Sequence, residues 1–332
     1  MSNNKEKIEN DNEHDNIDQS LIDELLKIKG VGESIAIKLI EANYPTIESI
    51  ASATILQLNK NADIGEKTAA KIIGNAQEMI NISFIDAQQL LEIREDMKRF
   101  TTGVEELDKL IGGGVETQSI IEVYGEFRTG KTQVAHQLCV TVQMSEGDGG
   151  LDASAIYMDC EGTFRPERIR DMAETFKLDP QLVLKNVQYI RIYNSDHLNV
   201  ALEKIPQVIM EHNIKLIVVD SIMTHLRSEY IGRGTLSSRQ QKLNTFLRKL
   251  HKVAEDFSLT VFLTNQVQTD PGVRWGNPTK PIGGNIMAHG STYRLYLRKA
   301  SGNKRVAKLV DSPCLPEGEA IFAITEKGIE NA

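Results

Sequence analysis

Residues 125–132, GEFRTGKT, constrain this chain more than any other stretch, because they match the phosphate-binding pattern G-x-x-x-x-G-K-[ST]. Glycines let the backbone curl so that successive N–H groups point inward at phosphate oxygens. Lys131 can then reach the β- and γ-phosphates of a nucleotide, and the Thr132 hydroxyl can ligate Mg²⁺. A helix that starts near Gly130 adds its positive end. The predicted ATP-binding residues of this stretch are Gly125, Glu126, Phe127, Arg128, Thr129, Gly130, Lys131, Thr132 and Gln133.

The sequence on either side of this loop supplies the context that the pattern requires. Residues 119–124 predict a buried strand that enters the loop, and residues 133–143 predict a helix that leaves it. In that helix Val134, Leu138 and Val142 are spaced for one face. The alternative is a surface glycine–lysine turn, but the order strand, loop, helix favours a nucleotide site.

Residues 100–332 alternate strand-like and helix-like segments, which predicts an α/β core with a doubly wound, mostly parallel, twisted sheet. Four apolar runs have the composition of strands buried on both faces. These expected strands are residues 155–158, 187–192, 216–219 and 259–263. The expected helices are residues 165–176, 199–212 and 237–257, and a β-rich end follows at 292–298, 305–310 and 320–325.

The N-terminal part has a different pattern. Residues 1–18 are rich in Asn, Asp and Glu, which predicts a disordered acidic tail, whereas residues 19–80 predict a small, compact, all-helical domain. A turn with Gly30 and Gly32 between two short helices resembles the helix-hairpin-helix module, whose glycine N–H groups can approach a DNA phosphate. A fainter copy at residues 63–68 lacks the first glycine. A helical bundle with glycine turns is the alternative.

Residues 81–99 form the predicted linker between the two domains. They contain Phe84 and Ala87, followed by a charged helix. A large aromatic residue in a linker can pack on its own domain or anchor in a pocket of a neighbouring molecule, and the sequence pattern leaves both alternatives open.

Composition bounds the class of protein. A chain of 332 residues with 40% hydrophobic content predicts two domains with a real core, without a membrane span or a signal peptide. The cysteines Cys139, Cys160 and Cys314 lie among apolar or small residues, which predicts buried free thiols in a reducing, cytoplasmic compartment. The net charge of −8 argues against nucleic acid only on average, because half of that excess lies in residues 1–20.

Polar side chains end three of the expected strands, where ligand-handling residues of such sheets lie. Asp220 follows residues 216–219 and would hold Mg²⁺ through water. Glu161, just after the strand at 155–158, could accept a proton from the water that attacks the γ-phosphate, or orient that water. Gln266 follows residues 259–263 and could sense the γ-phosphate. Each residue alone could be a cap or turn residue, but three such strand ends around one phosphate loop favour the catalytic interpretation.

Two segments predict contacts with DNA. Residues 268–290 are long, rich in Gly and Pro, and carry Arg274, Trp275 and Lys280, which suit phosphates and bases. Residues 227–239 form a second expected irregular stretch, and its candidate DNA contacts are Arg227, Tyr230, Arg233 and Arg239. Mobile surface loops are the alternative.

Long strings of residues 20–332 closely resemble the RecA family of strand-exchange recombinases, and within it the archaeal members and their eukaryotic relatives. The strings are GEFRTGKTQ at 125–133, EGTFRPER at 161–168, GRG at 232–234, PIGGNI at 281–286, LYLRK at 295–299 and DSPCLPE at 311–317. The resemblance implies a RecA-type P-loop ATPase core with ATP and Mg²⁺ as cofactors.

The resemblance also implies roles for individual residues. Phe84 and Ala87 correspond to the polymerisation motif, and Glu161, assisted by Lys131 and Gln266, to the catalytic group. By the same resemblance Arg168 would lie near the adenine, and Asp311 and Pro316 would cap the ATP of the adjacent protomer. His289 would sense the γ-phosphate across that interface. The segments around 227–239 and 268–290, with Gly283 and Gly284, would be the DNA-binding loops.

The implied activity is that of an ATP-dependent DNA recombinase in the cytoplasm, associated with the nucleoid. It would assemble into a helical filament or a ring on single-stranded DNA and exchange strands with a homologous duplex. A regulatory paralogue that binds ATP and DNA without strand exchange is the first alternative, and a hexameric helicase the second. The helical domain and residues Phe84 and Ala87 favour the recombinase.

Overall fold

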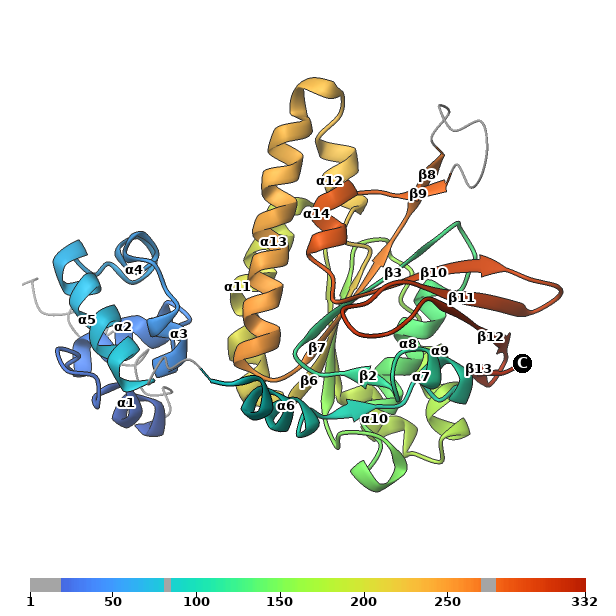
Figure 1. Ribbon diagram of the computed structural model, residues 1–332, viewed down its shortest axis with the longest axis horizontal. Coiled ribbons are helices and arrows are strands. Elements are labelled where there is room, and N and C mark those ends of the chain that lie inside the picture. Colours follow the sequence, from blue (N-terminus) through green and yellow to red (C-terminus); the bar gives the residue numbers. More distant parts are fainter. Residues whose placement is uncertain (1–18, 81–84, 270–278) are drawn as a thin grey trace, which may run out of the picture. The chain divides into compact units, whose positions relative to one another are not determined.

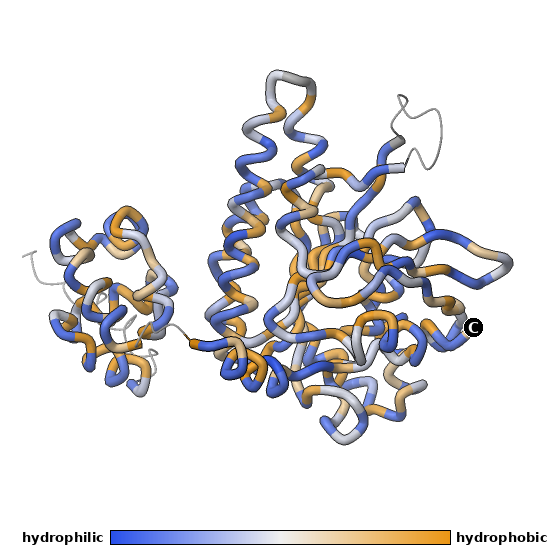
Figure 2. The backbone as a smooth tube through the Cα atoms, in the orientation of Figure 1, coloured by the Kyte–Doolittle hydropathy of each residue, from blue (hydrophilic) through white to orange (hydrophobic). Residues whose placement is uncertain are grey.

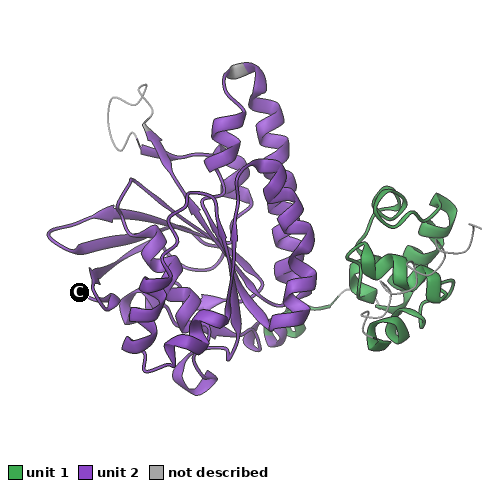
Figure 3. Cartoon of the chain, turned by 180° about the vertical axis from the view of Figure 1, so that it is seen from behind, with its two compact units in different colours: residues 1–91 green, residues 92–332 purple. Residues whose placement is uncertain are grey.

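The computed structural model describes residues 19–80, 85–269 and 279–332. The chain divides into two compact units, residues 1–91 and residues 92–332, which Figure 3 colours separately. Within the described ranges, no helix is both long and apolar enough to cross a membrane.

The first unit is a bundle of short helices around its own apolar core. Fully buried side chains such as Leu25, Leu39, Leu58 and Ile72 come from four different helices and belong to one core. These helices are α1 (Gln19–Leu25), α2 (Glu33–Glu41), α3 (Ile47–Ala51), α4 (Ile55–Ala62) and α5 (Glu66–Met79).

Two turns of this unit have the same construction. Gly30 has a φ of +97° and is followed by the buried Val31 and by Gly32, the N-cap of α2. Asp63, also in the left-handed region with a φ of +48°, is followed by the buried Ile64 and by Gly65, the N-cap of α5. Aspartate tolerates this conformation better than most residues. The fainter copy at residues 63–68 is therefore a real second hairpin, with a carboxylate where the first has a glycine.

The predicted linker contains α6 (Ala87–Glu95), a helix with no buried residue. Ala87 is exposed at its first position, whereas Phe84 lies outside the described residues. Arg94 near the end of α6 pairs with the buried Glu116 at 3.1 Å.

The second unit is built on a nine-stranded sheet in the order β13-β12-β11-β10-β3-β7-β6-β4-β5. Figure 1 shows β10 to β13 on the right of the view. The six strands from β10 to β5 run parallel, and β11 to β13 add antiparallel strands at the other side. The bounds are β3 (Ser119–Gly125), β4 (Ser154–Asp159), β5 (Val187–Arg191), β6 (Ile214–Asp220), β7 (Thr260–Asn265), β10 (Tyr293–Lys299), β11 (Lys304–Asp311), β12 (Gly318–Thr325) and β13 (Gly328–Asn331). A short ribbon, β1 (Arg99–Phe100) with β2 (Val115–Glu116), precedes them.

Helices cover both faces of the sheet, so that successive side chains of a strand enter opposite cores. In β6, Leu216 and Val218 join one core, while Ile217 and Val219 join the other. The first core is covered by α7 (Glu105–Leu110), α8 (Lys131–Thr141), α9 (Pro166–Thr175) and α10 (Pro180–Lys185), and the second by α11 (Ser195–His212), α12 (Thr224–Glu229), α13 (Leu236–Asp256) and α14 (Gly284–His289). Figure 2 shows α13 alternating between hydrophobic and hydrophilic stretches, as expected for a helix with one buried side.

The expected strands and helices are all present. The two segments with candidate DNA contacts, residues 227–239 and 268–290, are called the basic segments below, and they are more ordered than expected. Residues 227–239, expected to be irregular, run from α12 through a short 3₁₀ helix (Arg233–Thr235) into α13. The segment 268–290 was expected to lack structure, yet it includes most of an antiparallel ribbon, β8 (Val267–Thr269) with β9 (Thr279–Pro281), and α14. Local composition missed these elements because their stability comes from packing on the second core, where Ile282 and Met287 are buried.

The prediction of buried thiols is wrong for one cysteine. Cys139 and Cys160 are buried, and burial raises the pKa of both thiols. Cys314 is exposed in the turn after β11. The small residues beside Cys314 belong to a tight surface turn and not to a core. In this turn the Ser312 hydroxyl accepts the N–H groups of Cys314 and Leu315.

An ion pair lies inside the sheet, on the strand that leads into the phosphate-binding loop. Arg294 Nε on β10 donates to Glu122 Oε2 on β3 at 2.7 Å, and Glu122 is fully buried. The second oxygen, Oε1, accepts Asn265 Nδ2 at 2.6 Å, and the same amide nitrogen donates to the carbonyl of Ile282 at 2.6 Å. This network ties the centre of the sheet to the chain segment that returns from the β8–β9 ribbon.

We predict that Glu122→Gln lowers the free energy of unfolding by about 3–5 kcal/mol, because it leaves the Arg294 charge buried without its counter-charge. Glu319→Gln is the matched control, since it breaks the half-exposed Arg298–Glu319 pair at 2.9 Å and should cost less than about 1 kcal/mol. Urea unfolding followed by circular dichroism measures both. Equal losses in the two variants would contradict the assignment.

Candidate nucleotide site and neighbouring basic segments

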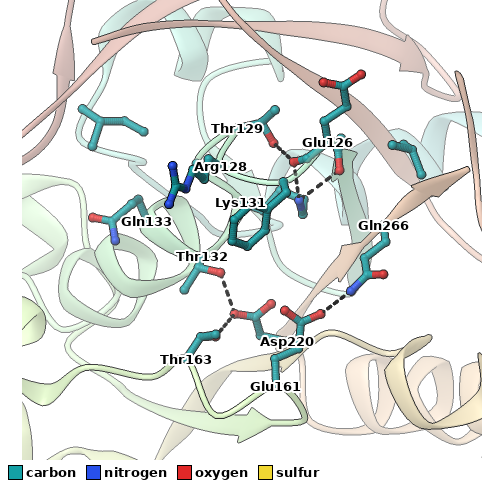
Figure 4. A pocket seen from close by; sticks show the side chains of 15 residues that line it. Glu126, Arg128, Thr129, Lys131, Thr132, Gln133, Glu161, Thr163, Asp220 and Gln266 are labelled. Carbon is teal, nitrogen blue, oxygen red and sulfur yellow. Dashed lines mark hydrogen bonds between the residues drawn. The ribbon is translucent and has the colours of Figure 1, made fainter. Parts of the chain in front are cut away.

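A cavity of about 580 Å³ opens at the carboxyl ends of β3, β4, β6 and β7 (Figure 4). All nine residues predicted from the phosphate-binding stretch, residues 125–133, line it, together with Glu161, Asp220 and Gln266. The residues that the sequence did not single out are Thr163, Val267 and Ile324. The tertiary structure therefore brings three separate strand ends to one cavity.

The phosphate-binding loop runs from β3 into α8, with Gly130 as the N-cap of the helix. A Cβ on Gly125 would lie 2.3 Å from the carbonyl oxygen of Leu297, so no other residue fits there. Lys131 Nζ donates to the carbonyls of Gly125 and Glu126 at 3.0 Å each. Burial lowers the pKa of this lysine, while the nearby carboxylates of Asp220 and Glu161 act in the opposite direction.

Asp220 is almost fully buried at the end of β6 and accepts hydroxyl groups from several elements. Its Oδ2 accepts Thr132 Oγ1 at 2.9 Å and Tyr157 OH at 2.7 Å, and its Oδ1 accepts Thr264 Oγ1. Thr163 Oγ1 lies 3.5 Å from Oδ2. The peptide bond between Asp220 and Ser221 is cis.

Thr132 and Asp220 are the residues that could hold Mg²⁺. Their side-chain oxygens are 2.9 Å apart in the cavity, and oxygen is the donor that this ion prefers. Across the described ranges, no group of three His, Cys, Asp or Glu residues gathers as a metal site. The oxygens of Thr132 and Asp220 would suit an ion held by one or two protein oxygens together with phosphates, which is how Mg²⁺ is usually bound.

Asp159 shapes the segment that carries Glu161. Its Oδ1 accepts the backbone N–H groups of Glu161, Gly162 and Thr163 at 3.0, 2.6 and 3.2 Å, and its Oδ2 accepts that of Phe164 at 3.3 Å. Two acids, Asp159 and Glu161, lie at this strand end. The structure separates their roles, because Asp159 is 1% exposed and organises the backbone while Glu161 lines the cavity.

The Glu161 carboxylate contacts one residue just before each of the two basic segments. Its Oε1 accepts Gln266 Nε2 at 2.7 Å, and Gln266 directly precedes β8 (Figure 4). The same oxygen accepts Thr224 Oγ1 at 3.0 Å, and Thr224 is the first residue of α12. Sequence reasoning missed Thr224, because only the position of α12 after β6 brings its hydroxyl to Glu161.

His136 on α8 was also missed. Its Nδ1 lies 2.6 Å from the Thr132 carbonyl, and its Nε2 lies 3.1 Å from the backbone nitrogen of Arg165. Burial lowers its pKa, although the Thr132 carbonyl and the carboxylates of Asp220 and Asp159 oppose this shift. The spacing of apolar residues along a helix does not distinguish such a histidine from a core residue.

Four predicted nucleotide contacts do not line the cavity. Arg168 donates Nε to Gln133 Oε1 at 2.7 Å, and its other nitrogens donate to the carbonyls of Thr325 and Glu326, so it clamps the turn between β12 and β13 beside the loop. His289 lies in a separate groove between α13 and α14, and Asp311 and Pro316 are exposed around the turn after β11. The roles of these last three across an interface remain predictions.

The candidate DNA contacts lie on the segments that leave the cavity. Arg227 is exposed on α12, Arg239 is partly buried on α13, and Lys280 is exposed on β9. Tyr230 packs partly against the second core, with Lys242 Nζ 5.7 Å from its ring centre. The backbone of Arg233 lies in the short 3₁₀ helix, Gly283 and Gly284 begin α14, and Arg274 and Trp275 lie outside the described residues.

Two family models match this chain. One is described as Rad51 and covers residues 93–332, and the other is described as a SAM-like helix-hairpin-helix tandem and covers residues 22–78. The chain is 46% identical over 314 residues to the DNA repair and recombination protein RadA of Aeropyrum pernix, covering 95% of this chain and 98% of that protein. The two hairpins at Gly30 and Asp63 agree with a tandem of helix-hairpin-helix motifs.

We predict that His136 makes the protein less stable in mild acid. Because the folded protein holds the pKa of His136 below its usual 6.5, the unfolded chain binds a proton there that the folded chain does not, and stability falls as pH drops below 6.5. The difference in free energy of unfolding between wild type and His136→Gln should therefore shrink from about pH 7.5 to about pH 5.5. Urea titrations across that range measure it, and a constant difference would contradict the shift.

Proposed function

The chain belongs to the Rad51 family, and on that basis we propose that it is an ATP-dependent DNA recombinase. In this proposal it assembles on single-stranded DNA, pairs that strand with a homologous duplex and exchanges strands in recombinational repair. It acts in the cytoplasm on nucleoid DNA, with ATP and Mg²⁺ as its cofactors.

One observation supports the coupling of ATP to DNA above the others. A single carboxylate oxygen, Glu161 Oε1, accepts hydrogen bonds from Thr224 and Gln266. Those two residues lie just before the segments that carry the candidate DNA contacts. A change at the γ-phosphate position can therefore reach both segments through one side chain.

The proposed chemistry assigns a separate task to each residue of the cavity. Lys131 neutralises phosphate charge, and Thr132 and Asp220 would hold Mg²⁺, which would supply further positive charge to the phosphate oxygens when bound. Glu161 orients the attacking water and accepts its proton. Gln266 reports the presence of the γ-phosphate, since it lines the cavity and also donates to Glu161.

The proposed DNA contacts come from both units. Arg227, Arg233, Arg239 and Lys280 neutralise phosphates, and Tyr230, Arg274 and Trp275 add contacts to phosphates or bases in the segments that follow the cavity. Gly284 leaves the backbone at the start of α14 accessible beside Gly283, and the hairpin with Gly30 and Gly32 adds contacts that do not depend on sequence.

ATP can favour the DNA-bound assembly only if it binds that state more tightly than the free state. The predicted source of this difference is a nucleotide held between two copies. Asp311 and Pro316 would cap the nucleotide of the adjacent copy, and His289 would contact its γ-phosphate. Their exposure, and their position outside the cavity of their own chain, are compatible with this role.

A second cavity suits the assembly. It measures about 330 Å³ and lies between β5, β4 and α11, with the apolar side chains of Met158, Ile190 and Ile205 in its lining. Strand β5 ends the sheet, so in the described part of the chain its outer edge has no neighbouring strand. An aromatic side chain in an extended segment fits such a site. We propose that Phe84 of another copy occupies it, with Ala87 beside it.

We predict that Lys131→Ala abolishes ATP hydrolysis and strand exchange together, because the phosphate charge loses its partner in a half-buried site. The matched control is Lys109→Ala on the exposed side of α7, which should retain both activities. Phosphate release and a strand-exchange assay with a nonhomologous duplex as control measure the two. Normal turnover in Lys131→Ala would contradict the nucleotide assignment.

We predict that Phe84→Glu prevents assembly on single-stranded DNA, since a carboxylate would have to enter an apolar cavity. Electron microscopy with ATP and single-stranded DNA should show extended helical filaments or rings for wild type, and isolated particles for the variant. Phe127→Glu is not a suitable control, because Phe127 lines the nucleotide cavity. Leu56→Glu is the suitable control, because it changes an exposed side chain of α4. Filaments of Phe84→Glu that resemble those of wild type would exclude the docking.

A further inference from the structure

Five consecutive backbone N–H groups, from Glu161 to Arg165, are held by two side chains. Asp159 accepts the first four. His136 Nε2 accepts the fifth, from Arg165, at 3.1 Å. The segment that carries Glu161 is therefore fixed at its beginning from β4, and at its end from α8, the helix that follows the phosphate-binding loop.

The two contacts of His136 determine which tautomer it adopts. Nδ1 lies 2.6 Å from the carbonyl oxygen of Thr132, which can only accept, so Nδ1 carries the proton. Nε2 faces the backbone N–H of Arg165, which can only donate, so Nε2 must be unprotonated. The ring is thus neutral, and it joins the turn of α8 that carries Thr132 to the end of the Glu161 segment.

The surroundings hold the ring in this orientation. His136 is 1% exposed, and its ring stacks on Phe164 with centroids 5.2 Å apart and an interplanar angle of 15°. Tyr157 lies against it with centroids 5.3 Å apart. The charged groups nearest to the imidazole are Asp220 and Asp159 at the strand ends and Arg168 on α9. A ring confined in this way can transmit position, because it has little freedom to move.

We propose that His136 is a positioning residue for ATP hydrolysis, which holds the Glu161 segment in register with the turn of α8 that supplies Thr132. The proposal rests on the function proposed above. In it, His136 does not touch the nucleotide, since it does not line the cavity. Its loss should therefore affect the alignment of Glu161 in the reaction far more than the binding of the nucleotide.

Two substitutions separate the two hydrogen bonds of His136. His136→Asn places a short amide near the position of Nδ1, so that it can still donate to Thr132 but cannot reach Arg165. His136→Gln places its longer amide oxygen near the position of Nε2, so that it can accept the Arg165 N–H. Both replacements are uncharged at every pH. His197→Asn, on α11 and outside the cavity, controls for the loss of a histidine.

Hydrogen exchange of the full-length chain, without nucleotide, tests the hydrogen bond itself. In His136→Asn the Arg165 amide should exchange at least about tenfold faster than in wild type, and in His136→Gln it should stay protected. The amides of Glu161 to Phe164 are an internal reference, because Asp159 holds them in every variant. An Arg165 amide that stays equally slow in His136→Asn would overturn the proposal.

Steady-state ATP hydrolysis tests the positioning role. For His136→Asn we expect kcat to fall at least about tenfold, as for a catalytic group displaced by a fraction of an ångström, with KM within about threefold. His136→Gln should restore most of kcat. The proposal is wrong if His136→Asn turns over as fast as His136→Gln, or if kcat and nucleotide affinity fall together. A wild-type chain without turnover would overturn the proposed function and this role with it, while the exchange data would still report the hydrogen bond.

Discussion

The site depends on one buried carboxylate. Asp220 is 2% exposed, and a carboxylate removed from water is costly unless its oxygens accept hydrogen bonds. Those bonds come from Thr132 on α8, Tyr157 on β4 and Thr264 on β7. Burial and the neighbouring Asp220 raise the pKa of Tyr157 well above the usual value, so its hydroxyl keeps the proton that it donates to Asp220. Satisfying Asp220 therefore holds the phosphate-binding helix against two strands, and the nucleotide cavity is part of the core rather than a surface addition.

A division of labour follows among the acidic residues around that cavity. The carboxylate oxygens of Asp159 accept backbone N–H groups, and those of Glu122 accept Arg294 and Asn265, so both acids are structural. Glu161 is only half-buried, and its carboxylate is shared with Thr224 and Gln266. It is therefore the acid to which the proposed function gives the catalytic role. Because Asn265 also holds the carbonyl of Ile282, the ribbon that begins at β8 is tied to the sheet at both of its ends.

Much of this arrangement was predictable from residue order. The phosphate-binding pattern, the apolar runs and the polar residues after them indicated a mostly parallel sheet with Lys131, Asp220 and Gln266 at one edge, and all three line the cavity. What could not be predicted has a common cause. Thr224 and His136 act through hydrogen bonds to segments that are distant in the sequence, and no local pattern specifies such a partner. The basic segments were expected to be irregular for the same reason, since Ile282 and Met287 fold them onto a core that local composition does not reveal.

The sequence by itself determined the class of fold, the phosphate-binding loop and the set of strand ends that surround it, because backbone geometry and burial on both faces of a sheet impose local patterns. Only the tertiary structure decided which acid is structural and which is free to act. That distinction depends on which donors each carboxylate meets, and those donors come from residues up to 172 positions away, as Arg294 does for Glu122. A carboxylate at a strand end acquires its role from the side chains that the fold places around it.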